Sequence, residues 1–245
     1  MKQWSLFLES LKPQEQVLME AANLEYDRYI LIRKRGSGFP GSKVVLAIID
    51  KSDLTEQIRG AIKEIENNPK DGFPEIKGSC LKGTIECNLF TRQNKTIYAT
   101  DSVFAEDKLG PLLYDAMFVY LHMLNPENSL VPANSLSPDS KQVWQRYSTT
   151  LKGATGLTLK KGPPPLDAIR PEQASTYSAD SVPSELISWI QNSSKNYFET
   201  LFEQVPPEIE PVLDKEIADL VRYVGEDKFM TAYSDFALNP DYNDN

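Results

Sequence analysis

The hydrophobic pattern at the start of the chain predicts both strands and helices. Residues 29–32 and 44–49 are β-branched and apolar, and glycine and proline separate them, so two strands joined by a loop are expected. Residues 13–23 are good helix formers behind a proline and predict a short helix. From Asp53, the expected N-cap, apolar residues recur at helical spacing as far as Asn67.

The middle of the chain predicts a pair of strands followed by a loop and a helix. Residues 76–90 and 96–104 have the composition of strands and are expected to pair as consecutive antiparallel strands. A helix is expected to begin at Gly110 and Pro111, because proline suits the first helical turn. One face of that helix is expected to carry the apolar side chains of Leu113, Ala116, Met117, Tyr120 and Leu124.

The following segment predicts a strand, a helix and a last strand. Residues 129–133 are expected to form a brief strand, and residues 153–162 a final one. Between them, Ser137 and Pro138 have the residue types of an N-cap and a first helical position. The inward side of the helix that they begin is expected to carry Val143, Trp144 and Tyr147.

A run of prolines at positions 163–165 predicts a boundary between two parts of the chain. Residues 1–162 are expected to form an α/β (α+β) domain, and residues 163–245 an acidic helical extension punctuated by proline. Apolar spacing in the extension predicts a helical stripe that docks on the domain or on another subunit. Helices are expected at residues 184–202, 208–224 and 227–236.

Charge is unevenly distributed along the chain. The net charge is −9, and residues 163–245 alone, with five basic and sixteen acidic side chains, carry −11. An acidic surface repels nucleic acid phosphates, so nucleic-acid binding through this part is not expected. It favours a basic protein partner, and a solvated charged face is the simpler alternative.

Other features of the sequence limit the location of the chain and its chemistry. No apolar run reaches the length of roughly 18 residues that spans a membrane, and the first ten residues lack a signal-peptide pattern, so a cytoplasmic protein is expected. Cys80 and Cys87 are the only cysteines and are expected to be reduced thiols. The single histidine, His122, lies in an apolar helical pattern and is expected to be structural, so no metal site is predicted.

The strand, loop and helix over residues 96–124 form the segment with the most chemical information. A strand that enters a helix through a glycine-containing loop directs free backbone N–H groups and the positive end of the helix at one place. Such a place suits a phosphate or pyrophosphate group. The glycine is Gly110, directly before Pro111.

The residues around this loop resemble a known family. Residues 110–115 (GPLLYD) and 135–147 (SLSPDSKQVWQRY), together with residues 80–87 (CLKGTIEC), resemble GNAT-type N-acetyltransferases of the kind found in tailed phages. The resemblance covers about residues 76–150. It implies a mixed, mostly antiparallel sheet flanked by helices, with acetyl-CoA held between two splayed central parallel strands.

The resemblance also implies which residues bind acetyl-CoA. The family places the pyrophosphate on a Q/R-x-x-G-x-G/A loop, and residues 105–110 here (AEDKLG) keep only the last glycine, with Lys108 in place of the first. Glu106 and Asp107 add negative charge near the expected anion. The cofactor contacts are expected at Lys108, Leu109, Gly110, Pro111 and Leu112.

Catalytic residues are expected in the second helix and on the preceding strands. In the family a tyrosine of that helix protonates the departing thiolate, and the aligned residue here is Trp144. Tyr147, one turn later, is the expected substitute, with Tyr114 as another. Glu86 and Asp101, expected near strand ends, are the candidate general bases for the substrate amine.

Three functions follow from these features. The first is an acetyl-CoA-dependent N-acetyltransferase, active or degenerate. The second is a non-catalytic GNAT-fold phage structural or host-interaction component, located in the virion or the host cytoplasm, with the acidic C-terminal helices as the surface for a protein partner. The third is an unrelated α+β binding module. A homo-oligomer is compatible with each of the three.

Trp144→Ala is expected to lower the free energy of unfolding by about 3 kcal/mol or more, because the predicted helix turns this large ring inward. Denaturant unfolding followed by circular dichroism measures the loss. A value near zero would show that the ring is exposed and that the inward face of the helix is wrongly assigned.

Overall fold

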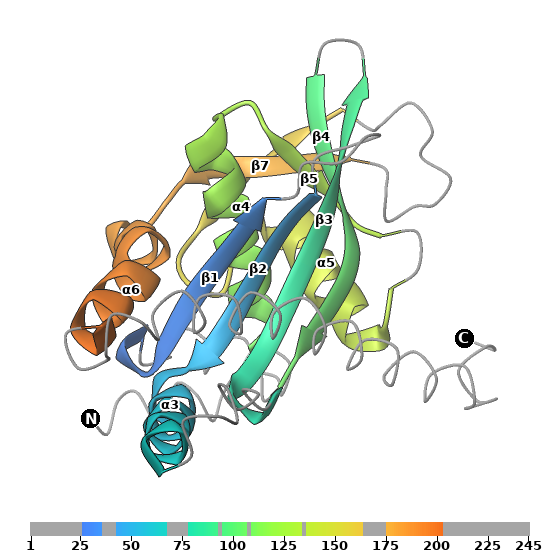
Figure 1. The fold of residues 1–245 in the computed structure, drawn as a ribbon. Coiled ribbons are helices and arrows are strands. Elements are labelled where there is room, and N and C mark those ends of the chain that lie inside the picture. The colour runs from blue at the N-terminus through green and yellow to red at the C-terminus, as the bar shows by residue number, and fades with distance from the viewer. Residues whose placement is uncertain are drawn as a thin grey trace, which may run out of the picture.

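The computed structural model describes residues 26–35, 43–67, 78–92, 95–106, 109–133, 136–163 and 175–202. These residues form an α+β fold built on a curled seven-stranded sheet in the order β1-β2-β3-β4-β5-β7-β6 (Figure 1). Neighbouring strands are antiparallel except for β4 and β5, which are parallel. The strands are β1 (Tyr29–Arg35), β2 (Lys43–Asp50), β3 (Leu81–Arg92), β4 (Lys95–Ala105), β5 (Ser129–Val131), β6 (Thr158–Gly162) and β7 (Thr176–Ser181).

Four α-helices and two short 3-10 helices accompany the sheet in the described part of the chain. The α-helices are α3 (Lys51–Asn67), α4 (Gly110–Leu124), α5 (Pro138–Thr150) and α6 (Ser184–Phe202), and the 3-10 helices are η1 (Tyr26–Arg28) and η2 (Gly78–Cys80). The expectation of a mixed, mostly antiparallel sheet with helices is confirmed. The helices expected at residues 13–23, 208–224 and 227–236 lie outside the described residues.

Most predicted elements between residues 29 and 162 are present, with two differences, and one strand beyond residue 162 was not predicted. The strand expected to begin at residue 76 begins at Leu81, because residues 78–80 form η2. The last strand of this part covers only Thr158–Gly162, because Gly153 to Leu157 form a turn closed by the Gly153 N–H donating to the Leu157 carbonyl. The strand β7 was not predicted, since its sequence TYSADS has few β-branched residues.

The N-cap of α3 is Asp50, not Asp53 as predicted. The Asp50 carboxylate, at the end of β2, accepts hydrogen bonds from the backbone N–H groups of Ser52 at 3.0 Å and Asp53 at 3.4 Å. Arg28 Nε donates to the same carboxylate at 2.7 Å. The helix therefore begins at Lys51, three residues before the predicted position, because Asp50 already supplies the capping acceptor.

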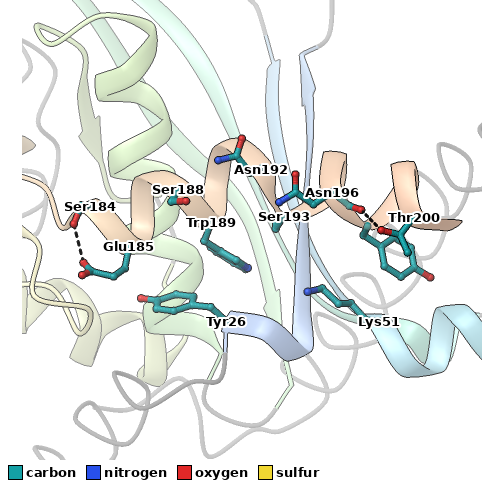
Figure 2. Close-up of a pocket in the computed structure, with 11 residues that line it drawn as sticks. Tyr26, Lys51, Ser184, Glu185, Ser188, Trp189, Asn192, Ser193, Asn196 and Thr200 are labelled. Atoms are coloured by element: carbon teal, nitrogen blue, oxygen red, sulfur yellow. Dashed lines mark hydrogen bonds between the residues drawn. The ribbon is translucent and has the colours of Figure 1, made fainter. Parts of the chain in front are cut away.

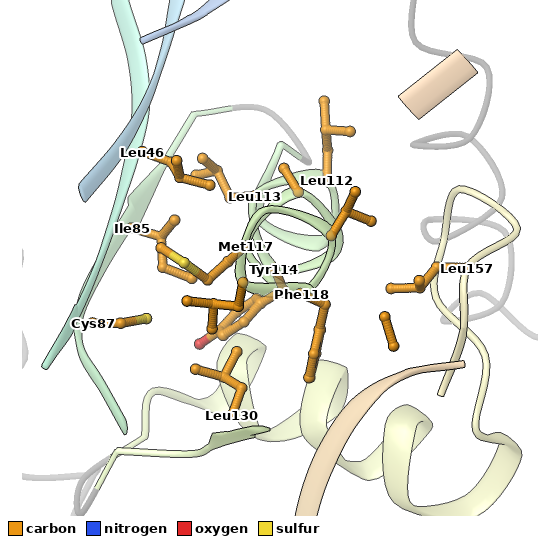
Figure 3. Packing of buried hydrophobic residues seen from close by; sticks show 14 of the residues in the cluster. Leu46, Ile85, Cys87, Leu112, Leu113, Tyr114, Met117, Phe118, Leu130 and Leu157 are labelled. Carbon is orange, nitrogen blue, oxygen red and sulfur yellow. The ribbon is translucent and has the colours of Figure 1, made fainter. Parts of the chain in front are cut away.

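The main core lies between the sheet and the helices α4 and α5. The sequence predicted one apolar face on α4, but almost the whole helix is buried, including Pro111 to Val119. Figure 3 views α4 nearly end-on, with Leu46 and Ile85 of the sheet on one side and Leu157 on another. A helix that is apolar all round is expected to be surrounded by protein. It is the central helix of this fold.

A second core lies on the opposite side of the sheet, where α3 packs. Ile30, Ile49 and Leu81 of the sheet contact Leu54 and Ile58 of α3. The last turn of α6 also reaches this core through its Leu201 side chain. The sheet is therefore covered on both faces in its β1–β3 part, which explains why β2 is almost wholly apolar.

The edge of the sheet at β1 is covered by α6 (Figure 1). Ser193 Oγ accepts a hydrogen bond from the Leu31 N–H at 3.0 Å, and Trp189 Nε1 donates to the Tyr29 carbonyl at 3.0 Å. An edge strand with unpaired backbone groups invites association with other strands. Side chains of α6 satisfy two of these groups, and its buried Ile190 anchors the helix, as the predicted apolar stripe requires.

The boundary expected after Gly162 falls between two paired strands of one sheet. In that pair Gly162 lies opposite Thr176, and Thr158 lies opposite Ser181. Strand β7 is also inserted between β5 and β6, so residues beyond the proline run complete the sheet.

A chain that ends at Gly162 is expected to precipitate or to lose its cooperative melting transition, because β5 and β6 lose the strand between them and β1 loses its cover. Size-exclusion chromatography and thermal melting followed by circular dichroism measure this. A chain that ends at Phe202 is the matched control, since it keeps β7 and α6. An unchanged melting temperature in the shorter chain would contradict the prediction.

Candidate functional site

The parallel strands β4 and β5 pair only over a short stretch. They pair over three residue positions, and the last pair joins Ala99 to Val131. Strand β5 ends there, whereas β4 continues to Ala105. In the described part of the chain, the β5-facing edge of β4 beyond Ala99 has no strand partner, and we call this edge, residues 100–105, the β4–β5 wedge.

A β-bulge lies at the start of the wedge. Glu86 pairs with Ser102 and Cys87 pairs with Thr100, so Asp101 is an extra residue in β4. A bulge leaves the extra residue outside the regular hydrogen-bond ladder and bends the strand. Bulges are common next to functional sites for this reason. The irregular backbone of β4 thus begins where its pairing with β5 ends.

The N-terminus of α4 lies just beyond the end of β4. Leu109 is the N-cap residue, and no side chain caps the helix. Pro111 has no N–H group, so the first turn offers the backbone N–H groups of Gly110 and Leu112 without a side-chain acceptor. The positive end of the helix dipole adds to the attraction for an anion at this place.

Among residues 109–112, only Gly110 is available to a ligand. The side chains of Leu109 and Leu112 are buried in the core, whereas Gly110 is partly exposed. A methyl group on Gly110 would lie 3.8 Å from the Ala105 Cβ, which is an ordinary contact. The protein itself therefore leaves room for a side chain at Gly110. Lys108, which is the one charged residue among the predicted cofactor contacts, lies outside the described residues.

The negative charge of the loop is partly offset by Lys82. Its Nζ atom lies 3.7 Å from a carboxylate oxygen of Glu106 and 3.0 Å from one of Asp53. The Glu106 N–H also donates to the Lys82 carbonyl at 2.7 Å, which prolongs the β3–β4 pairing to the loop. The repulsion that Glu106 was expected to exert on an anion is therefore reduced by an adjacent cation.

Gly83 sets the position of α4 over β3 and β4. A Cβ atom at Gly83 would lie 2.8 Å from Leu113 Cδ1 and 3.0 Å from the Phe104 carbonyl oxygen. Such distances are too short for a side chain, so the absence of one lets the first turn of α4 approach the sheet. The helix N-terminus is thereby held against the end of β4.

The two predicted general bases, Glu86 and Asp101, are brought together in the middle of their strands rather than near strand ends. Glu86 forms an ion pair with Lys43 of β2. Burial raises the pKa of Glu86, a hydrogen bond with Asp101 and its negative charge raise it further, and the ion pair with Lys43 opposes this. Glu86 thus holds a proton more readily than an isolated carboxylate does. It lies on the opposite side of β3 from the buried Cys87.

Tyr147, the predicted proton donor, lies in the core and is 1% exposed. Its hydroxyl donates a hydrogen bond to Asp115 Oδ1 at 2.8 Å. The other carboxylate oxygen of Asp115 accepts from the N–H and the hydroxyl of Thr155, each at 2.8 Å. Burial raises the pKa of Tyr147 well above its usual value, and the charge of Asp115 adds to the effect. The hydroxyl is committed to Asp115 and shielded from solvent.

Asp115 was missed as an important residue by sequence reasoning. It is fully buried, and burial raises its pKa while its hydrogen bonds oppose the rise. The available signal was a single acidic residue within the apolar run GPLLYDAMF. Its hydrogen bonds join α4 to α5 and to the turn before β6.

Trp144 and Tyr114 belong to an aromatic cluster beside this network. The Trp144 ring is 3% exposed and meets Tyr114, Phe118 and Tyr147 edge-to-face, with centroids 5.6 to 6.1 Å apart. Burial raises the pKa of Tyr114 to about 12, so its hydroxyl stays protonated at neutral pH. The inward position predicted for Trp144 is confirmed.

Comparisons of the chain with protein-family models, with characterised proteins and with solved structures find no match. Within the described residues, no helix is long and apolar enough to cross a membrane.

Gly153→Ala is expected to lower the free energy of unfolding by about 1–3 kcal/mol, because the added methyl group overpacks a rigid buried network. A Cβ atom at Gly153 would lie 2.4 Å from an oxygen of the Asp115 carboxylate, which three hydrogen bonds hold in place. Denaturant unfolding measures the change.

Gly60→Ala in α3 is the matched control for this substitution. A Cβ atom there has no neighbour within 4 Å, and alanine favours a helix by about 1 kcal/mol over glycine, so this variant is expected to be more stable. Equal stability changes in the two variants would contradict the role assigned to Asp115.

Proposed function

We propose that the chain is a GNAT-like protein that binds acetyl-CoA in the β4–β5 wedge and transfers the acetyl group to an amine. The observation that carries the proposal is the β4–α4–β5 unit. It combines the parallel pair of the described sheet, the end of that pairing at Ala99 and Val131, and a helix N-terminus without a side-chain cap at the end of β4. The sequence resemblance implies a cofactor between two splayed parallel strands, and these features fit that expectation.

The anionic part of acetyl-CoA is assigned to the first turn of α4. The N–H group of the partly exposed Gly110 and the helix dipole bind negative charge without a side-chain cation. The buried side chains of Leu109 and Leu112 hold this turn in place, and Lys82 reduces the effect of Glu106. The packing of the protein itself does not require a glycine at position 110. We therefore assign Gly110 the role of letting the pyrophosphate come close to the backbone.

The reacting groups are assigned to the bulge side of the wedge. Acetyl-CoA supplies an activated acetyl group when bound. The Glu86–Asp101 pair takes a proton from the substrate amine, since one of the two carboxylates has a raised pKa and the other can accept a hydrogen bond. Tyr147 is left out of this assignment because its hydroxyl holds Asp115, so a proton for the leaving thiolate comes from water.

A non-catalytic GNAT-fold protein is the second candidate. The observation that favours it is the commitment of Tyr147 to a buried structural network, which leaves the protein without the expected proton donor. In that function the acidic C-terminal residues bind a protein partner. That expectation depends on the acidic helices after Pro165, of which residues 184–202 are described and residues 203–245 lie outside the described part of the chain.

Calorimetric titration of the full chain with acetyl-CoA is the first test. We expect saturable binding, and we expect Gly110→Ala to weaken it at least about tenfold, equivalent to about 1.4 kcal/mol, because a methyl group obstructs the approach of the pyrophosphate. The variant should remain folded, since a Cβ atom at Gly110 meets only Ala105 at an ordinary distance. Gly60→Ala controls for the loss of a helical glycine elsewhere.

Two outcomes separate the candidates. Binding of acetyl-CoA together with amine-dependent release of free thiol supports the transferase, and Glu86→Gln is expected to reduce that release while binding persists. Binding without thiol release for any of a panel of amines supports the non-catalytic protein. Absence of acetyl-CoA binding would refute the site, and with it both GNAT-like candidates.

A further inference from the structure

A groove of about 740 Å³ runs along α6. Helix α6 packs on β1, the strand at one end of the sheet, so the groove lies away from the β4–β5 wedge in the middle of the sheet. It lies between α6, η1 and the start of α3 (Figure 2). Figure 2 shows Tyr26 and Glu185 toward one end of the groove and Lys51 toward the other, near Ser193 and Asn196. Its volume is in the range of about 300–1,000 Å³ that is typical of small-molecule sites.

Lys51 is placed where its charge does not help the fold. It is the first residue of α3, where the helix dipole repels a cation. Its side chain is half-buried, and in the described part of the chain no carboxylate forms an ion pair with it. The nearby Asp50 is already bound by Arg28 at 2.7 Å. Violations of a local rule without compensation are typical of binding sites.

Neutral hydrogen-bonding groups accompany Lys51 in the groove. Ser188, Asn192 and Asn196 follow one another at intervals of four residues, so they lie along one face of α6. All three are exposed, and the amides of the two asparagines each offer two N–H donors. Together with the three N–H donors of the Lys51 ammonium group, these amides give the groove more donors than the two oxygens of a carboxylate require. A phosphate group has more oxygens to accept them, so phosphate is favoured.

The other end of the groove suits an uncharged organic group that carries the phosphate, which we call the carrier, rather than a second anion. Tyr26 contributes a half-buried ring, 5.4 Å from the Trp189 ring centre to centre. Glu185 beside it repels anions and accepts hydrogen bonds from hydroxyl or amino groups. From Ser188 to Asn196 the helix rises about 12 Å, the length scale of a nucleoside or sugar attached to one phosphate.

We propose that this groove binds a small phosphate monoester. The phosphate group binds Lys51 and Asn196, and the hydroxylated carrier lies against Tyr26, Ser188 and Glu185. The site is independent of the acetyl-CoA site, because it is formed by α6, η1 and α3 and shares no residue with the first turn of α4.

Titration of the full chain with adenosine monophosphate and with glucose 6-phosphate tests the proposal. We expect at least one ester to bind, and we expect Lys51→Gln to weaken that binding at least tenfold. Lys195→Gln is the matched control, because Lys195 lies on α6, which lines the groove, but is itself exposed, pairs with Glu199 and does not line the groove. Tighter binding of the first ester assigns a nucleoside carrier, and tighter binding of the second a sugar.

Several results would overturn the proposal. They are no binding of either ester at millimolar concentration, equal binding by wild type and Lys51→Gln, or an equal loss in Lys195→Gln. Inorganic phosphate that binds as tightly as both esters would remove the role given to Tyr26 and Glu185. Lys51→Gln should keep its melting temperature, since it removes a cation from a helix N-terminus. Gly110→Ala should leave ester binding unchanged, which separates this groove from the acetyl-CoA site.

Discussion

The burial of α4 between the sheet and α5 is the packing on which the rest of the structure depends. This helix follows β4 directly and crosses over to β5, so its position fixes the parallel pairing of those two strands. Apolar side chains surround it almost completely, and the hydrogen bonds of Asp115 to Tyr147 and Thr155 fix the helix relative to α5 and the turn before β6. A buried carboxylate without these partners would be costly, so the network and the packing support each other.

The rigid placement of α4 also gives the wedge its properties. Gly83 allows the first turn to lie close to β3 and β4, and the buried Leu109 and Leu112 prevent it from moving away. The uncapped N–H groups are therefore presented at a fixed place, which lowers the entropic cost of binding an anion there. A buried first turn has a second consequence: the ligand can be recognised there only through the backbone and the dipole.

Electrostatics differs between the two candidate sites. At the wedge, attraction for an anion comes from backbone dipoles, with Lys82 compensating Glu106. At the groove along α6, it comes from the ammonium group of Lys51, which has no ion pair among the described residues, and from neutral amides. The same helix α6 also covers the edge of β1 through Ser193 and Trp189, two residues that line the groove as well.

The local elements were determined by the sequence alone. The apolar runs of β1 and β2, the N-cap of α5 at Ser137 and the residue range of α6 were all predicted, because they depend on periodicity and on hydrogen bonds between near neighbours. The tertiary structure alone decided what depends on distant partners. Strand β7 forms because β5 and β6 flank it, Tyr147 becomes structural because Asp115 lies 32 positions earlier and 2.8 Å away, and Glu86 meets Asp101 only through the bulged register. Such contacts have no signature in a local pattern, because the energy that makes them comes from burial and pairing across the sheet.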